Sequence, residues 1–204
     1  ELHGAVVPAD QEQVRMTLKI PPTALEETIL LDMDGHSVRG RSQRVKITRP
    51  AIPAESMMQA FLWLQVVPAE QWAVVISGKK VNKPPVEFPT GGRAELKHGE
   101  TTKLTAKVTQ KGSAAQQIIV DLSEPPKGIK LEEKKIEGEA MVVEISTDAE
   151  VVEAGMRGNL IFEAFREWTP APTEAVPEPE PRRSSYGYLP AIPFEVKGKP
   201  TRRR

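Results

Sequence analysis

The sequence predicts an all-β protein made of two antiparallel β-sandwich domains. Between residues 101 and 165, apolar side chains recur at alternate positions or in short blocks of strand length, in residues 102–109, 117–122, 141–146 and 159–165. Turn residues separate these runs, as in Lys111-Gly112-Ser113 and Pro125-Pro126-Lys127-Gly128. Short strands with turns about every 8–12 residues are typical of an antiparallel sandwich.

Composition limits the classes of partner. The chain has 204 residues, which suggests one or two domains. Its 28 basic and 28 acidic residues give a net charge of 0, so no global field favours nucleic acid or an anionic membrane. We therefore expect no nucleic-acid partner. The 19 prolines are about twice the usual ~5% share, which favours strand edges and linkers over helices.

Several kinds of site are excluded by residue type. The chain has no cysteine, which excludes disulfides, thiolate zinc sites and cysteine nucleophiles. No apolar run approaches the ~18 residues of a membrane helix, so we expect no membrane insertion. The chain starts at Glu1 without a signal peptide, so we expect a processed protein or a piece of a longer one.

The first domain is predicted to span residues 1–83, with residues 1–13 as a lead-in that could belong to a preceding module. Its expected strands are residues 14–20, 28–33, 37–41 and 44–48, and Asp34-Gly35 is a predicted hairpin turn. The apolar run 56–67 fits either a helix or a strand. We favour a strand that turns at residues 68–71 and returns along 72–77, and leave open a helical turn near residues 54–57.

The second domain is predicted to span residues 84–198, after a linker at 78–85. Residues 147–150 match a capping box and predict one helical turn. The Pro/Glu-rich residues 169–185 predict an exposed insertion, and residues 199–204 a basic tail. Residues 188–196 are the expected closing strand, paired with 159–165. Pro190 and Pro193 cannot donate to a ladder, which predicts an edge position or irregular pairing.

Two short sequences occur twice. Val6-Val7-Pro8-Ala9-Asp10-Gln11 is similar to residues 66–71, and Arg49-Pro50-Ala51-Ile52-Pro53 is similar to residues 189–193. Shared ancestry would make the chain a fragment of a tandem array. Recurrence of short proline motifs by chance is the alternative.

Part of the chain resembles a known class of module. Residues 129–131, 143–145, 148–150, 155–161 and 189–196, and in the first domain residues 52–61 and 67–70, resemble immunoglobulin-like modules of long exported bacterial proteins. The resemblance covers roughly residues 45–197. It implies two tandem immunoglobulin-like sandwiches that are non-catalytic and lie in the periplasm, at the cell surface or outside the cell. It brings no active site that could be transferred to this chain.

Candidate catalytic and metal-binding residues are few. Ser77 and Lys80 have the S-x-x-K spacing of serine acyl-enzymes, but the S-D-N and K-T-G elements are missing. Asp32 and Asp34 alternate as in calcium loops, although they supply too few oxygen ligands. The histidines His3, His36 and His98 are scattered in the sequence. We expect no catalytic residue, no metal and no cofactor.

Aromatic residues suggest a binding surface. Trp168, Tyr186 and Tyr188 bracket the proline-rich insertion, and they are the candidate surface for a ligand or partner. Trp63 and Trp72 are expected to pack in a core. The main hypothesis is a structural or adhesive module that acts as a spacer or protein–protein assembly unit, with neighbouring modules or other proteins as partners. The alternative is a carbohydrate-binding accessory domain, which would need an exposed aromatic platform.

Overall fold

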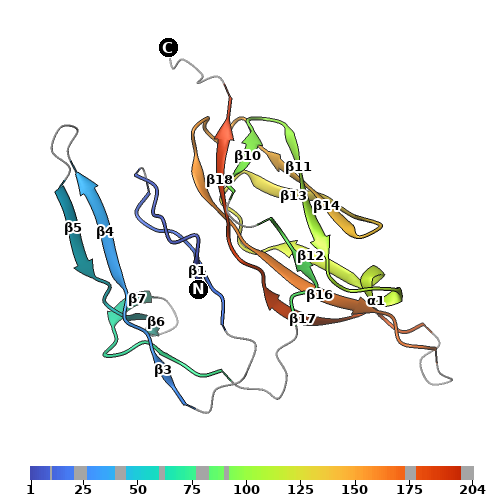
Figure 1. The fold of residues 1–204 in the computed structure, drawn as a ribbon, viewed down its shortest axis with the longest axis horizontal. Coiled ribbons are helices and arrows are strands. Elements are labelled where there is room, and N and C mark those ends of the chain that lie inside the picture. Colours follow the sequence, from blue (N-terminus) through green and yellow to red (C-terminus); the bar gives the residue numbers. More distant parts are fainter. Residues whose placement is uncertain are drawn as a thin grey trace. The chain divides into compact units, whose positions relative to one another are not determined.

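A computed structural model describes residues 1–9, 11–20, 27–39, 45–59, 63–76, 83–89, 92–172 and 178–198. The predicted all-β class is confirmed, because strands dominate the described residues beside one short helix, α1 (Ser113–Gln116). The chain divides into two compact units (Figure 1). The larger combines Glu1–Ile20 with Asn82–Arg204, and the smaller is Pro21–Val81.

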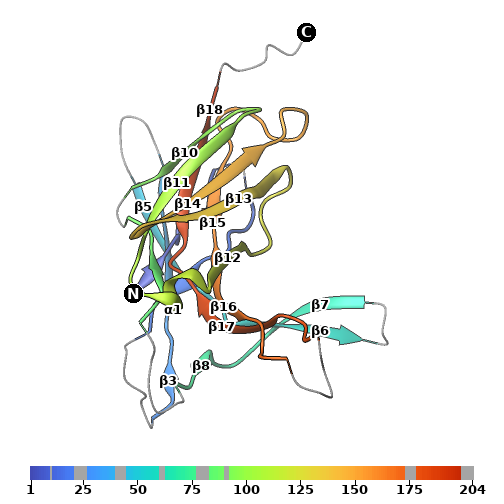
Figure 2. The same ribbon diagram turned by 90° about the vertical axis from the view of Figure 1, so that its right-hand side faces the viewer.

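One layer of the larger unit is a four-stranded antiparallel sheet (Figure 2). Its strands, in spatial order, are β13 (Ile129–Glu137), β14 (Ala140–Thr147), β11 (Thr101–Val108) and β9 (Val86–Glu87). Along β14 every second side chain is buried, including Met141, Val143 and Ile145. This period of two explains why the sequence forms a strand with one face against a core.

The opposite layer is built on a long bent hairpin. Its first arm runs through β15 (Arg157–Leu160) and β16 (Phe162–Trp168), and its second through β17 (Arg182–Tyr188) and β18 (Ile192–Lys197). One half of the hairpin pairs with β12 (Ile118–Leu122) in the order β12-β16-β17. The other half pairs with β10 (Ala94–Lys97) in the order β10-β18-β15, where β10 runs parallel to β18.

The core of the larger unit lies between these layers. Phe162, Phe194, Leu160 and Val196 from the hairpin are fully or almost fully buried, in one cluster with the inward side chains of β14. The ring of Phe88 stacks on that of Phe162, with centroids 4.8 Å apart. The two layers are therefore joined by apolar burial.

The N-terminal segment also belongs to the larger unit. Its strands β1 (Leu2–His3) and β2 (Thr17–Leu18) pair antiparallel. The sequence predicts that this segment is part of a domain spanning residues 1–83, with residues 1–13 as a lead-in that could belong to a preceding module. The structure groups it with residues 82–204 instead, because hydrogen bonds such as that from Asn159 to the Gly4 carbonyl tie it to β15.

The smaller unit consists of three antiparallel strand pairs. They are β3 (Ile29–Leu30) with β8 (Ala73–Val74), β4 (Asp34–Arg39) with β5 (Val45–Pro50), and β6 (Ala54–Gln59) with β7 (Trp63–Pro68). Large apolar side chains here are exposed, among them Val38, Ile52, Met58, Leu64 and Val66. Of the described residues in this unit, Ile76 is the buried apolar one.

Three local predictions need correction. Asp34-Gly35 is not a hairpin turn, since both residues pair with β5 inside strand β4. Residues 56–59 and 63–67 do form strands, but these are parts of β6 and β7, which pair with each other, while β8 pairs with β3. The turn predicted at 147–150 has a different cap: Asp148, not Thr147, accepts the Glu150 N–H with its carboxylate at 2.9 Å and the Val152 N–H with its carbonyl at 2.8 Å. The bond from Val152 spans four residues, as in one turn of an α-helix, and the carboxylate bond is that of a helix N-cap.

The closing strand is partly as predicted. β18 does pair antiparallel with β15. It is not an edge strand, however, because β10 pairs along its other side. The predicted insertion 169–185 also ends earlier, since β17 begins at Arg182. Side-chain bonds from Arg183 and Ser185 to β16 hold these polar residues in the sheet.

Burial of Phe194 predicts a large loss of stability on truncation of its side chain. We expect Phe194→Ala to lower the free energy of unfolding by about 3–5 kcal/mol, because a phenyl group is removed from a closed core. Urea denaturation would measure this. Tyr188→Ala, at a side chain that is 60% exposed, is the matched control and should cost about 0.5 kcal/mol or less. Equal losses in the two variants would contradict the assignment of β18 to the core.

Candidate functional site: a polar network on the β12–β16–β17 sheet

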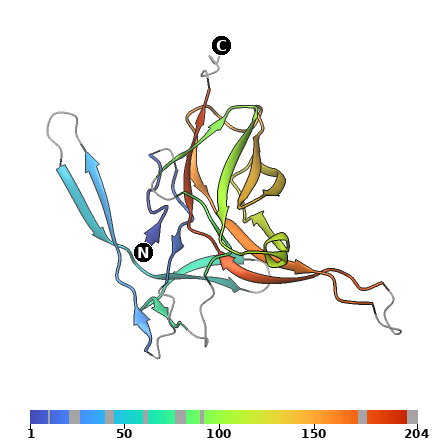
Figure 3. The ribbon, with the colours of Figure 1, turned by 45° about the vertical axis from the view of Figure 1, so that its right-hand side comes forward.

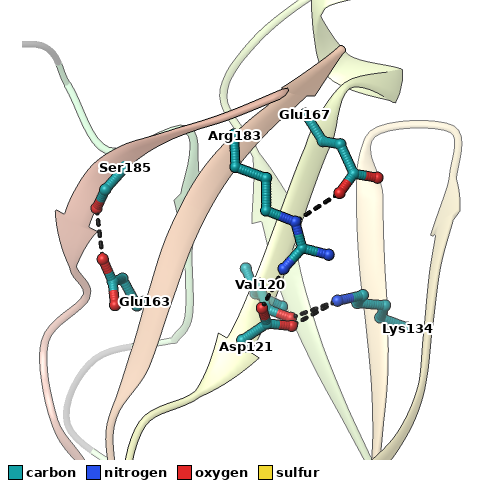
Figure 4. A network of polar contacts seen from close by, with 7 residues as sticks. All are labelled: Val120, Asp121, Lys134, Glu163, Glu167, Arg183 and Ser185. Carbon is teal, nitrogen blue, oxygen red and sulfur yellow. Dashed lines mark hydrogen bonds and ion pairs between the residues drawn. The ribbon is translucent and has the colours of Figure 1, made fainter. Parts of the chain in front are cut away.

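A chain of polar contacts crosses one face of the β12-β16-β17 sheet (Figure 4). Arg183 on β17 lies opposite Glu167 on β16 in the antiparallel register, so their side chains share a face. The Arg183 Nε donates to Glu167 at 2.6 Å, and its Nη1 donates to the Asp121 carboxylate on β12 at 3.1 Å. Arg183 therefore ties together all three strands of this sheet.

Lys134 extends the network to the other layer. It lies on β13, the outer strand of the four-stranded sheet. Its Nζ is 2.6 Å from the Asp121 carboxylate and donates to the Val120 carbonyl at 3.1 Å. The backbone groups of Gln117 and Ser123 form hydrogen bonds toward β16. Successive residues of a strand direct their N–H and C=O groups to opposite sides, so the Val120 carbonyl points away from β16, to the open edge of β12. Lys134 thus caps that edge and links the two sheets.

The electrostatics of this network are balanced. The hydrogen bond to Glu167 raises the pKa of Arg183, and its charge is compensated by Glu167 and Asp121. The Ser185 hydroxyl donates to the Glu163 carboxylate at 2.6 Å, which resembles a nucleophile beside a base. Among the described residues, neither side chain forms a hydrogen bond or ion pair with a histidine. The arrangement joins neighbouring strands by paired charges and hydrogen bonds.

A second polar cluster surrounds Glu195 on β18. Its carboxylate lies 2.9 Å from Arg93, 3.1 Å from Lys197 and 3.2 Å from Arg157. The hydrogen bond from Arg93, with those from Lys197 and Arg157, lowers the pKa of Glu195 to about 2. Arg93 precedes β10 and Arg157 begins β15, so this carboxylate holds the β10-β18-β15 sheet together across all three strands.

An open groove of about 720 Å³ lies beside the network. Buried Ile118 and Met141 are at its floor, and Lys111, Lys134 and Glu139 are on its rim. Across the described part of the chain, no three histidine or carboxylate side chains are grouped as metal ligands would be. No described helix has the length and apolar character needed to cross a membrane.

Comparisons with protein-family models, with curated proteins and with solved structures find no match for this chain. The function must therefore be inferred from the geometry of the chain itself.

The three candidate aromatic residues do not form one platform. Trp168 is half-buried, and its ring centroid is 5.4 Å from the guanidinium carbon of Arg166. Tyr186 packs against the core, while Tyr188 is exposed. Trp168 pairs with Arg182 and Tyr188 pairs with Glu163. Because positions 163 and 168 of one strand point to opposite faces, Trp168 and Tyr188 lie on opposite sides of the sheet.

The remaining sequence candidates lie on different elements or outside the described residues. Ser77 and Lys80 lie outside the described residues, as does the side chain of Trp63. Trp72, expected in a core, is 43% exposed. His36 is in β4, where its Nδ1 is 3.1 Å from the Thr48 hydroxyl. His3 is in β1, and His98 is in the turn after β10.

The sequence alone does not predict either polar cluster. Arg183 falls within residues 169–185, for which the sequence predicts an exposed insertion, whereas it is the centre of the network. A weak signal exists in the sequence, since Tyr186 and Tyr188 follow the prolines and aromatic residues are enriched in strands. No local pattern identifies Asp121 and Lys134 as partners, because they are on strands of different sheets.

The lowered pKa of Glu195 predicts a pH-dependent stability. An acid whose pKa is lower in the folded state stabilises the fold when it is ionised. This contribution to the free energy of unfolding is complete above the unfolded-state pKa of 4.5 and is lost as the pH falls through the folded-state pKa of about 2. We expect the difference in unfolding free energy between wild type and Glu195→Gln to be constant above about pH 5 and to shrink toward pH 2. Urea denaturation from pH 2 to pH 7 would measure it.

The matched control is Glu95→Gln, whose exposed carboxylate is 3.8 Å from Lys197. Its unfolding free energy should follow that of the wild type across the pH range. A constant difference between wild type and Glu195→Gln down to pH 2 would contradict the assigned ionisation.

The edge-capping position of Lys134 predicts self-association when it is removed. In Lys134→Val the Val120 carbonyl and the β12 edge lose their cover, and an uncovered edge pairs with other chains. We expect a concentration-dependent rise in mass by sedimentation velocity, with a loss of about 0.5–1.5 kcal/mol in stability. Lys130→Val, at an exposed position of the same strand, should stay as the wild type. Equal behaviour of the two variants would refute the capping role.

Proposed function

We propose that this chain is a non-catalytic structural module that acts as a spacer or protein–protein assembly unit in a bacterial cell-surface or secreted protein. In this proposal residues 82–198 are an immunoglobulin-like sandwich. The strand order supports it: β13-β14-β11-β9 faces a sheet containing β12-β16-β17. In chain order these are the sheet memberships of strands ABED and CFG of a constant-type immunoglobulin domain.

The observation that carries the spacer role is the pairing of the strands near the two ends of this sandwich. β10 near its start and β18 at its end run parallel, with Ala94 opposite Phe194 and Lys97 opposite Lys197. Tension applied along the chain pulls two parallel strands in opposite directions. The ladder is then loaded in shear, so its hydrogen bonds must break together rather than one after another. Such a geometry suits a module that transmits force.

The assembly role and the location rest on other features. The smaller unit exposes many large apolar side chains on its hairpins, and exposed apolar residues favour protein contacts. We propose that it is a further module of the same class. The bacterial surface or secreted location comes from the sequence resemblance of residues 45–197. The aromatic residues Trp168, Tyr186 and Tyr188 point in different directions, so their placement does not favour the glycan-binding alternative.

Single-molecule force spectroscopy tests the spacer role. Lys83→Cys and Thr201→Cys would supply attachment points in a chain that has no other cysteine. The His98 N–H donates to the Lys197 carbonyl of β18. Every second residue of a strand directs its N–H to the same side, so the N–H of Ala94, four residues earlier, also points toward β18. Ala94→Pro removes that donor, and we expect it to lower the unfolding force.

The matched control is Glu95→Pro. By the same alternation, the N–H of Glu95 points away from β18, so its loss should leave the unfolding force close to that of the wild type. If the unfolding force of Ala94→Pro equals that of Glu95→Pro, or if the wild type unfolds without a resolvable force peak, the spacer proposal fails.

A further inference from the structure

The outer edge of β15 is covered by the N-terminal segment, defined here as residues 1–20, without a strand ladder. β15 is the last strand in the order β10-β18-β15. The Nδ2 of half-buried Asn159 donates to two carbonyls of the segment, those of Gly4 and Arg15, each at 2.7 Å. From the segment, the Gln11 Nε2 donates to the Arg157 carbonyl at 2.6 Å. Figure 3 shows the segment in blue alongside the orange and red strands.

Two further contacts secure the second half of the segment. The Arg15 Nη1 donates to the Ser123 carbonyl at 2.7 Å and lies 3.4 Å from the Glu124 carboxylate. The Ala191 N–H, between β17 and β18, donates to the Thr17 hydroxyl at 2.7 Å. The segment is therefore bound at three separate places on the larger unit: the β15 edge, the turn after β12 and the bend of the hairpin.

The fit at Gly4 makes this docking selective. Gly4 has φ +73°, and a Cβ at this position would lie 2.3 Å from the Asn159 Nδ2. A residue other than glycine is both strained there and in collision with the donor. The β15 edge thus recognises an extended segment by its backbone carbonyls, by a close glycine and by a threonine hydroxyl.

These contacts do not require the segment to come from the same chain. Residues 21–81 lie between the segment and residues 82–198 in the sequence. Docking within one chain must therefore close a long loop, which lowers the effective concentration of the segment at the β15 edge. A second copy offers the same carbonyls, glycine and threonine. Exchange of an identical element between copies preserves each contact and is a low-cost route to association.

We propose that the β15 edge is an intermolecular docking site for residues 1–20 of a second copy of this chain. The site joins copies by exchange of the N-terminal segment. This inference rests on the proposed assembly role and names its partner and surface. It does not depend on the parallel pairing of β10 with β18.

The test uses a fluorescent synthetic peptide with the sequence of residues 1–20 and the full chain carrying Gly4→Ala. The alanine displaces the chain's own segment but leaves every residue of β15 unchanged. We expect saturable binding by fluorescence anisotropy. Binding should weaken at least tenfold when the peptide also carries Gly4→Ala, and at least tenfold when Asn159→Ala is added to the chain. Light scattering of the wild type should show a dimer fraction that rises with concentration and is lost in Asn159→Ala.

Circular dichroism would establish that the Gly4→Ala chain is folded. If it is not, a chain with Arg15→Ala and Thr17→Ala replaces it, since these changes weaken the segment's own contacts and likewise spare β15. Binding that is absent in a folded chain, or that is insensitive to both Gly4→Ala in the peptide and Asn159→Ala in the chain, would overturn the inference. Such a result would leave the unfolding force of β10 and β18 unchanged, so it is distinguishable from a failure of the spacer role.

Discussion

Burial of the bent hairpin β15–β18 against the β13-β14-β11-β9 sheet is the interaction on which the larger unit depends. Phe162 and Phe194 come from its two arms and are fully buried. Burial of each such side chain contributes roughly 1.5–3 kcal/mol, a large fraction of the ~5–15 kcal/mol that stabilises a domain. The hairpin bends between β15 and β16, which lets one half pair with β10 and the other with β12. Burial of the hairpin therefore also sets the positions of β10 and β12, which pair with its two halves.

The polar clusters act where this apolar core ends. Lys134 covers the β12 edge, and the N-terminal segment covers the β15 edge. Two further outer strands are irregular: β13 has a register shift between Leu131 and Glu133, and β17 has one beside Tyr186. Capping charges, covering segments and bulges each prevent uncontrolled pairing of sheet edges. Lys134 and Arg183 thus have a structural role, which fits the proposed module, whose contacts with other chains must be selective.

The two units differ in the burial of their apolar side chains. In the larger unit the inward positions of the strands are buried, whereas hairpins β4–β5 and β6–β7 of the smaller unit expose Val38, Met58 and Leu64. A sequence pattern with period two is present in both. Burial requires a second layer, and the described residues 27–39, 45–59 and 63–76 form separate two-stranded pairs. This contrast supports an assembly role in which further protein surface covers the smaller unit.

The sequence by itself determined the all-β class and the position of most strands of the larger unit, because strand formation follows the local alternation seen in residues such as 102–108 and 141–146. It also identified β18 as a strand paired with β15. Only the tertiary structure decided the central place of β18, the meeting of Asp121 with Lys134 and Arg183, and the separation of Trp168 from Tyr188. Each of these depends on which strands become neighbours and in what register. Pairing is set by the burial of side chains distant in sequence, and a shift of one residue would reverse every face.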